Sequence, residues 1–197
     1  KAGIDGRIEE NPGRNSPFFK NVTNLIIASN IMALQSAKAE AEKLGYNTII
    51  LSSQFEGDTT DAAYFHSEIA KEILSSSNPA ARPACVISGG ETTVKVTGSG
   101  LGGRNMEFAI QSALRIDGIG KITVASISTD GTDGPTDAAG AIAVCNTVKR
   151  GKITGLEITD YIKNSDSYNF FLKLGDLLFT GPTNTNVMDV RIIIIDN

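Results

Sequence analysis

The chain has 197 residues, of which 41% are hydrophobic and 20% charged, and its formal net charge at pH 7 is −4. This length can bury a sizeable core and fits a globular protein, while the acidic balance gives no electrostatic reason to expect nucleic acid or a membrane as a partner. The two cysteines, Cys85 and Cys145, have no C-x-x-C spacing. That usage disfavours a disulfide framework or a zinc site and suits a reducing cytoplasm.

The first residues, KAGIDGRIEENPGRNSP, are rich in Gly, Pro and Asn and contain neither an initiator Met nor an apolar signal core. We therefore expect residues 1–24 to be a linker or the end of a missing amino-terminal domain, and residues 25–197 to form an α/β domain. The longest apolar run, residues 190–195, is short and interrupted by Arg191, so it predicts a buried strand and not a membrane span.

Helix-like and strand-like segments alternate after residue 25. Apolar residues at helical spacing predict a helix over about residues 30–44, which ends at Gly45. A second helical repeat, from Ala62 to Ile73, lies between two short apolar strands, YNTIILS and ACVISGG. The elements predicted downstream are an alternating strand at TTVKVT, a helix over about 105–115, a strand at KITVASIST, helices at about 146–150 and 156–174, and closing strands at LLFT and NVMDVRIIII. This order predicts a layered α/β/α domain with a mixed β-sheet.

The stretch TGSGLGGRN has Gly98, Gly100 and Gly103 at the G-x-G-x-x-G spacing of dinucleotide-binding turns. Its context does not fit such a turn, because the preceding strand alternates and the acid near the expected offset, Asp117, comes before the next strand instead of ending it. Positive φ angles at the glycines, with a helix that begins near Arg104, would instead suit a phosphate or carboxylate pocket. The alternative is a flexible turn with a solvated Arg.

A loop rich in aspartate, STDGTDGPTDAAGA, follows the strand that ends at Ser128. Asp130, Asp133 and Asp137 lie at the carboxyl end of that strand, where α/β folds bind ligands. Carboxylates with nearby hydroxyl groups suit Mg²⁺ or the hydroxyl groups of a substrate. Because Asp and Gly are also the natural residues of turns, a series of Asx turns is the alternative.

Two further polar segments follow predicted strands. Glu91 comes after two glycines in SGGETT, while LFTGPTNTN offers uncharged donors and acceptors that suit a sugar acid or phosphate. Ordinary polar turns explain the second segment equally well. The single histidine, His66, lies beside the apolar face of its helix, so we expect it to be packed or half-exposed and not catalytic.

Three long segments, in this order, resemble the hallmarks of the carboxyl-terminal, MOFRL-type region of the type 2 glycerate kinases. They are GGETTVKVTGSGLGGRNMEFAI, STDGTDGPTDAAGAI and LLFTGPTNTNVMDVRIIII. SNIMALQSAKAEAEKLGYNTIILS and DSYNFFLKLGDLLFTGPTNTN are also similar to family segments. The resemblance therefore covers nearly the whole chain, and it identifies residues 25–197 as the expected MOFRL-type domain.

The resemblance implies ATP-dependent phosphorylation of D-glycerate at its 2-hydroxyl, with Mg²⁺, in a cleft between two α/β domains. By match to GGRN, Arg104 is the candidate catalytic or phosphate-contacting residue, and Gly102, Gly103 and Asn105 would shape its pocket. The remaining candidates are Glu91, Thr183 and Asn186 for substrate or phosphate, and Asp130, Asp133 and Asp137 for the metal.

Members of this family also have an amino-terminal Rossmann-like domain with a lysine that serves the active site, and this sequence contains no match to it. We therefore expect the chain to be the carboxyl-terminal part of a cytoplasmic enzyme, inactive alone, with its oligomeric state left open between monomer and homo-oligomer. Two other functions stay open. One is an NAD(P)-dependent hydroxypyruvate reductase, a label that family members have carried, and the other is a non-catalytic ligand-binding domain.

Overall fold

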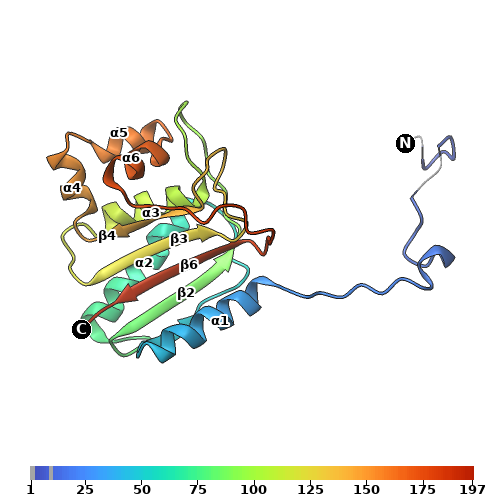
Figure 1. The fold of residues 1–197 in the computed structure, drawn as a ribbon, viewed down its shortest axis with the longest axis horizontal. Helices are drawn as coiled ribbons and strands as arrows, with labels where there is room; N and C mark the ends of the chain where they lie inside the picture. The colour runs from blue at the N-terminus through green and yellow to red at the C-terminus, as the bar shows by residue number, and fades with distance from the viewer. Residues whose placement is uncertain (1–2, 9–10) are drawn as a thin grey trace.

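A mixed six-stranded sheet forms the centre of the computed structural model, which describes residues 3–8 and 11–197 (Figure 1). The strand order is β1-β2-β6-β3-β4-β5. β1 and β2 pair in parallel, and the other neighbouring strands pair antiparallel. The strands span Asn47–Ile50 (β1), Ala84–Gly90 (β2), Ile122–Ser128 (β3), Gly140–Val144 (β4), Leu177–Leu178 (β5) and Asp189–Ile195 (β6).

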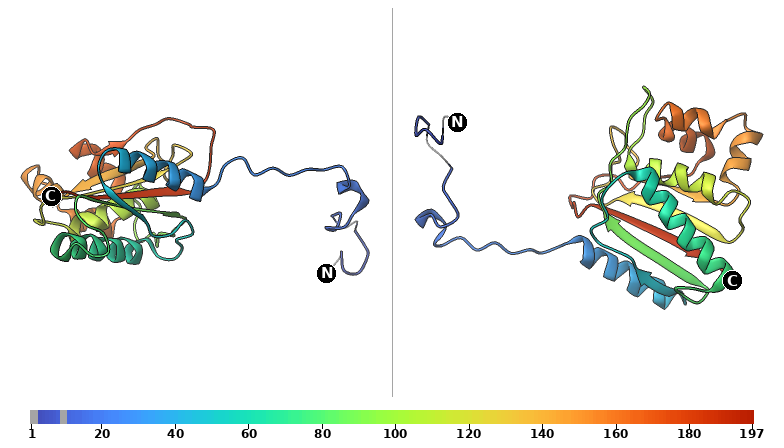
Figure 2. Two further views of the ribbon diagram at one scale, coloured as in Figure 1. Left: turned by 90° about the horizontal axis from the view of Figure 1, so that it is seen from below. Right: turned by 180° about the vertical axis from the view of Figure 1, so that it is seen from behind.

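Helices lie on both faces of the sheet, as the edge-on view in Figure 2 shows. α1 packs on one face, against β1, β2 and β6, whereas α2 and α3 pack on the other face, with α4, α5 and α6 beside α3. The helices span Asn30–Lys43 (α1), Thr59–Ser76 (α2), Arg104–Arg115 (α3), Thr147–Ile153 (α4), Ile158–Lys163 (α5) and Ser167–Leu174 (α6), and a 3₁₀ turn (η1) spans Pro17–Phe19. The predicted α/β/α layering and mixed sheet are confirmed.

The core has one apolar cluster on each side of the sheet. Every residue of β2 is buried, as expected for a continuous apolar run that is covered on both faces. On the α2 and α3 side, Phe108 and Ile110 of α3 are fully buried against the sheet. Leu34 of α1 packs on Ile87 on the other side. Because α3 is fixed by this packing, the position of its first residue, Arg104, is set by the core.

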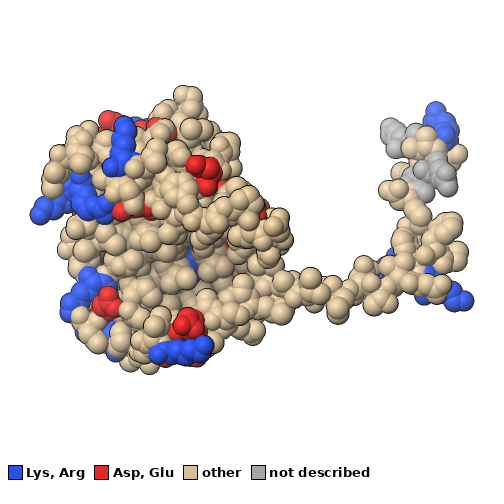
Figure 3. All heavy atoms as spheres, viewed as in Figure 1, with Lys and Arg blue, Asp and Glu red and all other residues tan. Residues whose placement is uncertain are grey.

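The α1 side of the sheet is only partly covered. Ile127 of β3 and Ile192 and Ile194 of β6 remain half-buried on that side. In Figure 3, the charged side chains of the visible face gather over α1 and over the α4–α6 region, and the band between them, over β3 and β6, is largely uncharged.

Three predictions of secondary structure are wrong. TTVKVT forms no strand, because no strand of the described sheet pairs with it and only an isolated bridge joins Thr93 to Asp58. Residues 140–144 form β4, although the predicted aspartate loop extended through residue 141 and no strand was predicted there. The helix predicted over 156–174 is two helices, since the chain turns at residues 164–166 with a left-handed backbone at Ser165 (φ 53°).

The segment before α1 runs away from the sheet (Figure 1), and among its described residues η1 is the one helical element and no strand occurs. Three of its apolar side chains, Leu25, Ile26 and Ile27, are 79%, 81% and 80% exposed. The parts of the predicted linker at residues 1–2 and 9–10 lie outside the described residues. Within the part of the chain that the structure describes, no helix has both the length and the apolar character that crossing a membrane requires.

Candidate active site

A pocket of about 960 Å³ lies beside the start of α3. Its walls come from the loop after β2, the glycine-rich segment, the aspartate loop and the α5–α6 turn. Five of the predicted site residues line it, namely Glu91, Gly102, Gly103, Arg104 and Asp133. The structure thus brings segments that are far apart in the sequence to one cavity.

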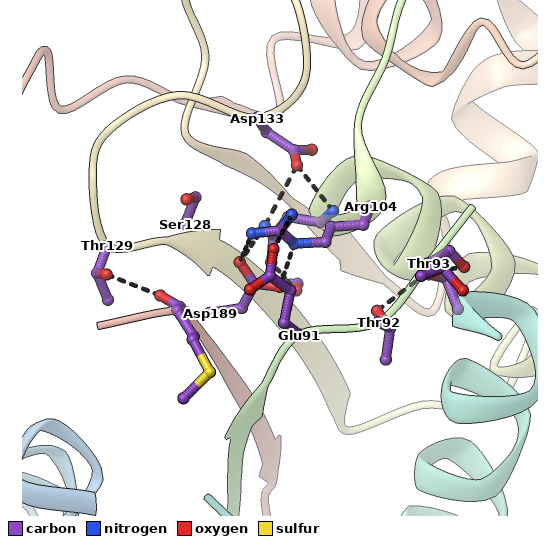
Figure 4. Close-up of polar contacts among 12 residues, drawn as sticks. Glu91, Thr92, Thr93, Arg104, Ser128, Thr129, Asp133 and Asp189 are labelled. Atoms are coloured by element: carbon purple, nitrogen blue, oxygen red, sulfur yellow. Dashed lines mark hydrogen bonds and ion pairs between the residues drawn. The ribbon is translucent and has the colours of Figure 1, made fainter. Parts of the chain in front are cut away.

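Arg104 is held along one edge of its guanidinium group. Its Nε donates to Asp189 Oδ2 at 2.7 Å and its Nη2 donates to Asp189 Oδ1 at 3.1 Å, a two-pronged ion pair that fixes the plane of the group (Figure 4). Its Nη1 lies 3.0 Å from Oε1 of Glu91, whose side chain is 55% exposed. The fixed edge therefore faces the protein interior, and the other edge meets a solvent-accessible carboxylate in the pocket.

The charge on Arg104 is retained although the side chain is only 28% exposed. Burial by itself opposes the charge, but the hydrogen bonds and charge of Asp189 outweigh it and raise the pKa of Arg104. Asp189, the first residue of β6, is fully buried and also accepts a hydrogen bond from Asn105 Nδ2 at 3.0 Å. The pocket therefore has a permanent cation whose counterion lies in the core.

The Asp133 carboxylate occupies the N-terminus of α3. Its Oδ1 accepts from Asn105 N at 3.1 Å and its Oδ2 accepts from Met106 N at 2.8 Å, which satisfies two of the N–H groups that a helix start leaves without partners. Asp133 is 2% exposed, and burial, the dominant effect, raises its pKa to about 6. Because the Asp133 carboxylate already occupies the start of α3, this helix start is not free to bind a substrate anion.

Asn105 lies fully buried beneath the pocket and does not line it. Its Nδ2 donates to both Asp133 and Asp189, and its Oδ1 accepts from Ser126 Oγ at 2.6 Å. With every polar atom of its side chain engaged, Asn105 joins α3 to the aspartate loop and to β3. Its observed position suits a role in shaping the pocket and not in direct contact with a ligand.

The glycine-rich segment differs from the prediction in its backbone. None of Gly98, Gly100, Gly102 and Gly103 has a positive φ. The glycines instead permit close packing, because a Cβ at Gly98 would collide with Asn164 and one at Gly103 with Asp133. Gly100 N donates to Asn164 O at 2.9 Å and Leu101 N to Asp166 Oδ1 at 2.9 Å, so the α5–α6 turn takes up N–H groups that a phosphate cradle would need.

The loop at residues 181–188 packs on the aspartate loop, away from the pocket walls. Thr183 N donates to the Asp130 carbonyl at 3.1 Å, and Asn186 Nδ2 lies 3.4 Å from Asp130 Oδ2. The Asp130 carboxylate also accepts from Thr132 N, the main reason that its pKa is lowered, and this is the pattern of an Asx turn. Thr183, Asn186 and Asp130 thus lie together outside the pocket walls and make no hydrogen bond to Arg104, although the charge of Arg104 contributes to the lowered pKa of Asp130.

The three aspartates expected to hold a metal do not converge. Asp133 caps α3, Asp130 forms the Asx turn, and the exposed Asp137 accepts from Tyr168 OH at 2.8 Å. Within residues 3–8 and 11–197, no group of three or more His, Cys, Asp or Glu side chains is arranged to hold a metal ion. The donor set of this chain therefore does not fit a resident Mg²⁺ at these positions.

Sequence reasoning missed two functional candidates, Asp189 and Arg191, which lie on the same face of β6. Both are fully buried in a strand that otherwise reads as apolar. Two charged residues of opposite sign at positions i and i+2 were the available signal, because alternate residues of a strand share one face. His66 was predicted to be packed or half-exposed, and it is packed. Phe55 and Phe108 surround its ring, and burial lowers its pKa to about 4.

The chain is similar to proteins of one known family. The MOFRL family model matches residues 84–189, which include β2, the glycine-rich segment, the aspartate loop and Asp189. D-glycerate 2-kinase of Thermotoga maritima is 42% identical over 90% of this chain and 42% of its own length. Glycerate 2-kinase of Pyrococcus horikoshii is 39% identical over 98% of this chain and 43% of its own length.

The fold comparison gives the same result. A crystal structure of glycerate kinase from Thermotoga maritima superposes with a TM-score of 0.86 at 42% identity, covering 89% of this chain and 42% of that one. The chain thus spans less than half the length of these two curated relatives. The family model covers more than half of the chain, and the resemblance noted in the sequence is confirmed: this chain belongs to the MOFRL family and corresponds to the MOFRL region of glycerate kinases.

Proposed function

We propose that this chain is the carboxyl-terminal part of an ATP-dependent glycerate 2-kinase, that the Arg104 pocket contacts the reacting groups, and that residues 1–24 join residues 25–197 to an amino-terminal domain. The observation that carries the proposal is the guanidinium group of Arg104, fixed on one edge by the buried Asp189 and presenting Nη1 to the pocket. The names of the relatives support the reaction class. The two free thiols, Cys85 and Cys145, suit a cytoplasmic enzyme.

Arg104 has the properties that phosphoryl transfer requires of a charged group. The transferring phosphoryl group spreads negative charge over its oxygens, and catalysis relies on cations that are already in position. Because Asp189 holds two of its nitrogens, Arg104 needs no reorganisation to present Nη1 to an anion. Glu91 neutralises that nitrogen in the absence of ligand, and its exposed carboxylate is free to move aside when a phosphate or a substrate carboxylate arrives.

The charge of the pocket supports the need for a second domain. Among the described residues that line it, four carry carboxyl groups, Glu56, Glu91, Glu107 and Asp133, and one is a cation, Arg104. An anionic acceptor and a nucleotide would be repelled by this balance unless further cations are supplied from outside the chain. The lysine of the Rossmann-like domain, implied by the family resemblance, would meet this need. We therefore propose that the 197-residue chain alone does not turn over glycerate.

In the proposed reaction, Mg²⁺ takes part only as an ion bound to ATP. A Mg²⁺ ion bound to the nucleotide neutralises part of the phosphate charge. We assign no ligand of that ion to this chain, because the oxygens of Asp133 are engaged by N–H donors and Asp130 and Asp137 point to separate partners.

The test compares the full-length protein with the 197-residue chain. Supplied with D-glycerate and MgATP, the full-length protein is expected to release ADP in a coupled assay and to form 2-phosphoglycerate, identified by ³¹P NMR, while the chain alone gives no turnover. Turnover by the chain alone would contradict the two-domain proposal. A nicotinamide absorbance change with hydroxypyruvate in the absence of ATP would show a reductase, and ligand binding without turnover by either form would show a binding domain.

A further inference from the structure

Arg191 is a fully buried charge in the middle of the sheet. It lies on β6 between Ser88 of β2 and Ser126 of β3, two residues after Asp189 and on the same face. Its Nη2 donates to Asp189 Oδ2 at 3.3 Å and to Thr92 Oγ1 at 3.0 Å. The guanidinium carbon lies 5.3 Å from the centre of the Phe108 ring. Arg191 therefore contacts the counterion of Arg104 from within the core and does not itself line the pocket.

The position is costly for an arginine. Burial lowers the pKa of Arg191, and the neighbouring charge of Arg104 lowers it further, against the attraction of Asp189. Within the described part of the chain, its Nε and Nη1 have no hydrogen-bond acceptor. A buried charge that lacks acceptors for two donor atoms adds less to stability than an apolar side chain of similar volume would. The fold by itself gives no reason for a guanidinium group at this position.

The contacts of Arg191 link two walls of the pocket. Asp189 Oδ2 accepts from both Arg104 Nε and Arg191 Nη2, so one carboxylate oxygen lies between two guanidinium groups. Thr92, the second contact, lines the pocket directly after Glu91 in the sequence. Thr59 Oγ1 at the start of α2 also lies 3.0 Å from Thr92 Oγ1. Arg191 thus ties the Asp189–Arg104 ion pair to the segment that carries Glu91.

We propose that Arg191 is a positioning residue, which holds Asp189 in the orientation that clamps Arg104 and fixes the distance between Arg104 and the Glu91 segment. Arg191 does not line the pocket, so it acts only through Asp189 and Thr92. The proposal rests on the proposed function, in which Arg104 contacts the reacting groups. Small displacements of such a group reduce the rate of the chemical step more than they reduce binding.

The kinetic test uses Arg191→Met and Arg191→Lys in the full-length protein. Met fills a similar volume without charge, and Asp189 keeps Arg104 and Asn105 as partners, so we expect the variant to fold. We expect kcat to fall by about 10- to 100-fold, with KM for the acceptor changed by less than about threefold. Lys keeps a charge beside Asp189 and is expected to restore part of kcat. Arg150→Met is the matched control, because Arg150 pairs with Asp176 and does not line the pocket.

A second readout does not depend on activity. With ¹⁵N-arginine labelling of the full-length protein, the Arg104 Nε–H signal is assigned by its loss in Arg104→Ala, and its exchange with water is measured. We expect exchange at least about tenfold faster in Arg191→Met than in wild type, since the clamp on Nε is loosened, and unchanged exchange in Arg150→Met.

The outcomes separate the two proposals. A kcat for Arg191→Met within about twofold of wild type, or unchanged Nε–H exchange, would overturn the positioning role. If Arg191→Met fails to fold, Arg191→Lys decides by the same measurements, and failure of both to fold would show that the charge is structural and overturn the proposal. If the wild-type protein does not phosphorylate glycerate, the proposed function fails, and the exchange measurement alone then decides the role of Arg191.

Discussion

Two polar regions of this molecule contain similar types of residue, but they differ in how deeply the side chains are buried and in where their contacts come from. In the first, around Arg104, the acidic partners Asp133 and Asp189 are buried, and their contacts come from α3, β6 and the aspartate loop. In the second, Thr183 and Asn186 are exposed and Asp130 is half-buried, and these residues bond to neighbouring turns. Charge placed in the core is expensive and must be compensated at fixed positions, whereas exposed turns need no such precision. The comparison therefore favours the first region as the active site.

The largest expected effect on stability is that of Asp189→Ala. The change leaves Arg191 fully buried without a counterion, which should lower the free energy of unfolding by about 3 to 5 kcal/mol. Urea unfolding followed by circular dichroism measures it. Asp130→Ala, in the second region, is the control and should cost less than about 1 kcal/mol. Equal losses in the free energy of unfolding of the two variants would contradict the proposed difference in construction between the two regions.

Asp133→Asn should have the next largest effect, about 2 to 3 kcal/mol, because an amide cannot accept from both Asn105 N and Met106 N as the carboxylate does. The effect depends on pH. The folded pKa of about 6 lies above the unfolded value of 3.8, so the native state binds more protons between these values, and the advantage of wild type over the variant shrinks as pH rises from about 4 to about 6. Urea unfolding of both proteins across this pH range measures the difference in their free energies of unfolding. A difference that grows as pH rises would contradict a raised pKa for Asp133 in the folded protein.

A smaller effect is expected for Gly100→Ala. An added Cβ would collide with Asp166 and the Asn164 carbonyl, so the glycine-rich segment would have to shift, at a cost of about 1 to 2 kcal/mol. Gly120→Ala is the matched control, since a Cβ there meets no atom within 4 Å and the backbone is compatible with alanine. Thermal unfolding should give a change within about 0.5 kcal/mol for this control. If the two variants are equally stable, the glycines are not required for packing.

The sequence predicted the layered fold and most of its elements because apolar periodicity and turn residues are local signals. β4 was missed, since its short GAIAV run stands beside a Gly-rich and Asp-rich loop that dominates the local pattern. TTVKVT alternates like a strand, but a strand also needs a partner along its length, and alternation alone does not reveal that this segment makes only an isolated bridge from Thr93 to Asp58.

Within the site, the sequence predicted Arg104 and Asp133 but assigned Asp133 to a metal. Its role as a cap for α3 depends on a contact between residues 28 positions apart in the chain. Asp189 was missed for a similar reason, since its partner Arg104 lies 85 positions away. The i, i+2 spacing of Asp189 and Arg191 indicated only that these two charges share a face of one strand, and it did not identify their long-range partners. For that reason, the exposed Thr183 and Asn186 were predicted as site residues together with residues that line the pocket.

The most direct test of the central claim is the kcat of Arg104→Ala in the full-length protein, measured with D-glycerate and MgATP. If Arg104 stabilises the transferring phosphoryl group, kcat should fall by about a thousandfold or more while the unfolding transition shows a folded protein. Arg115→Ala, at the other end of α3 where the side chain stacks on Tyr64, is the matched control and should keep kcat within about twofold. A folded Arg104→Ala protein with wild-type kcat would contradict the account.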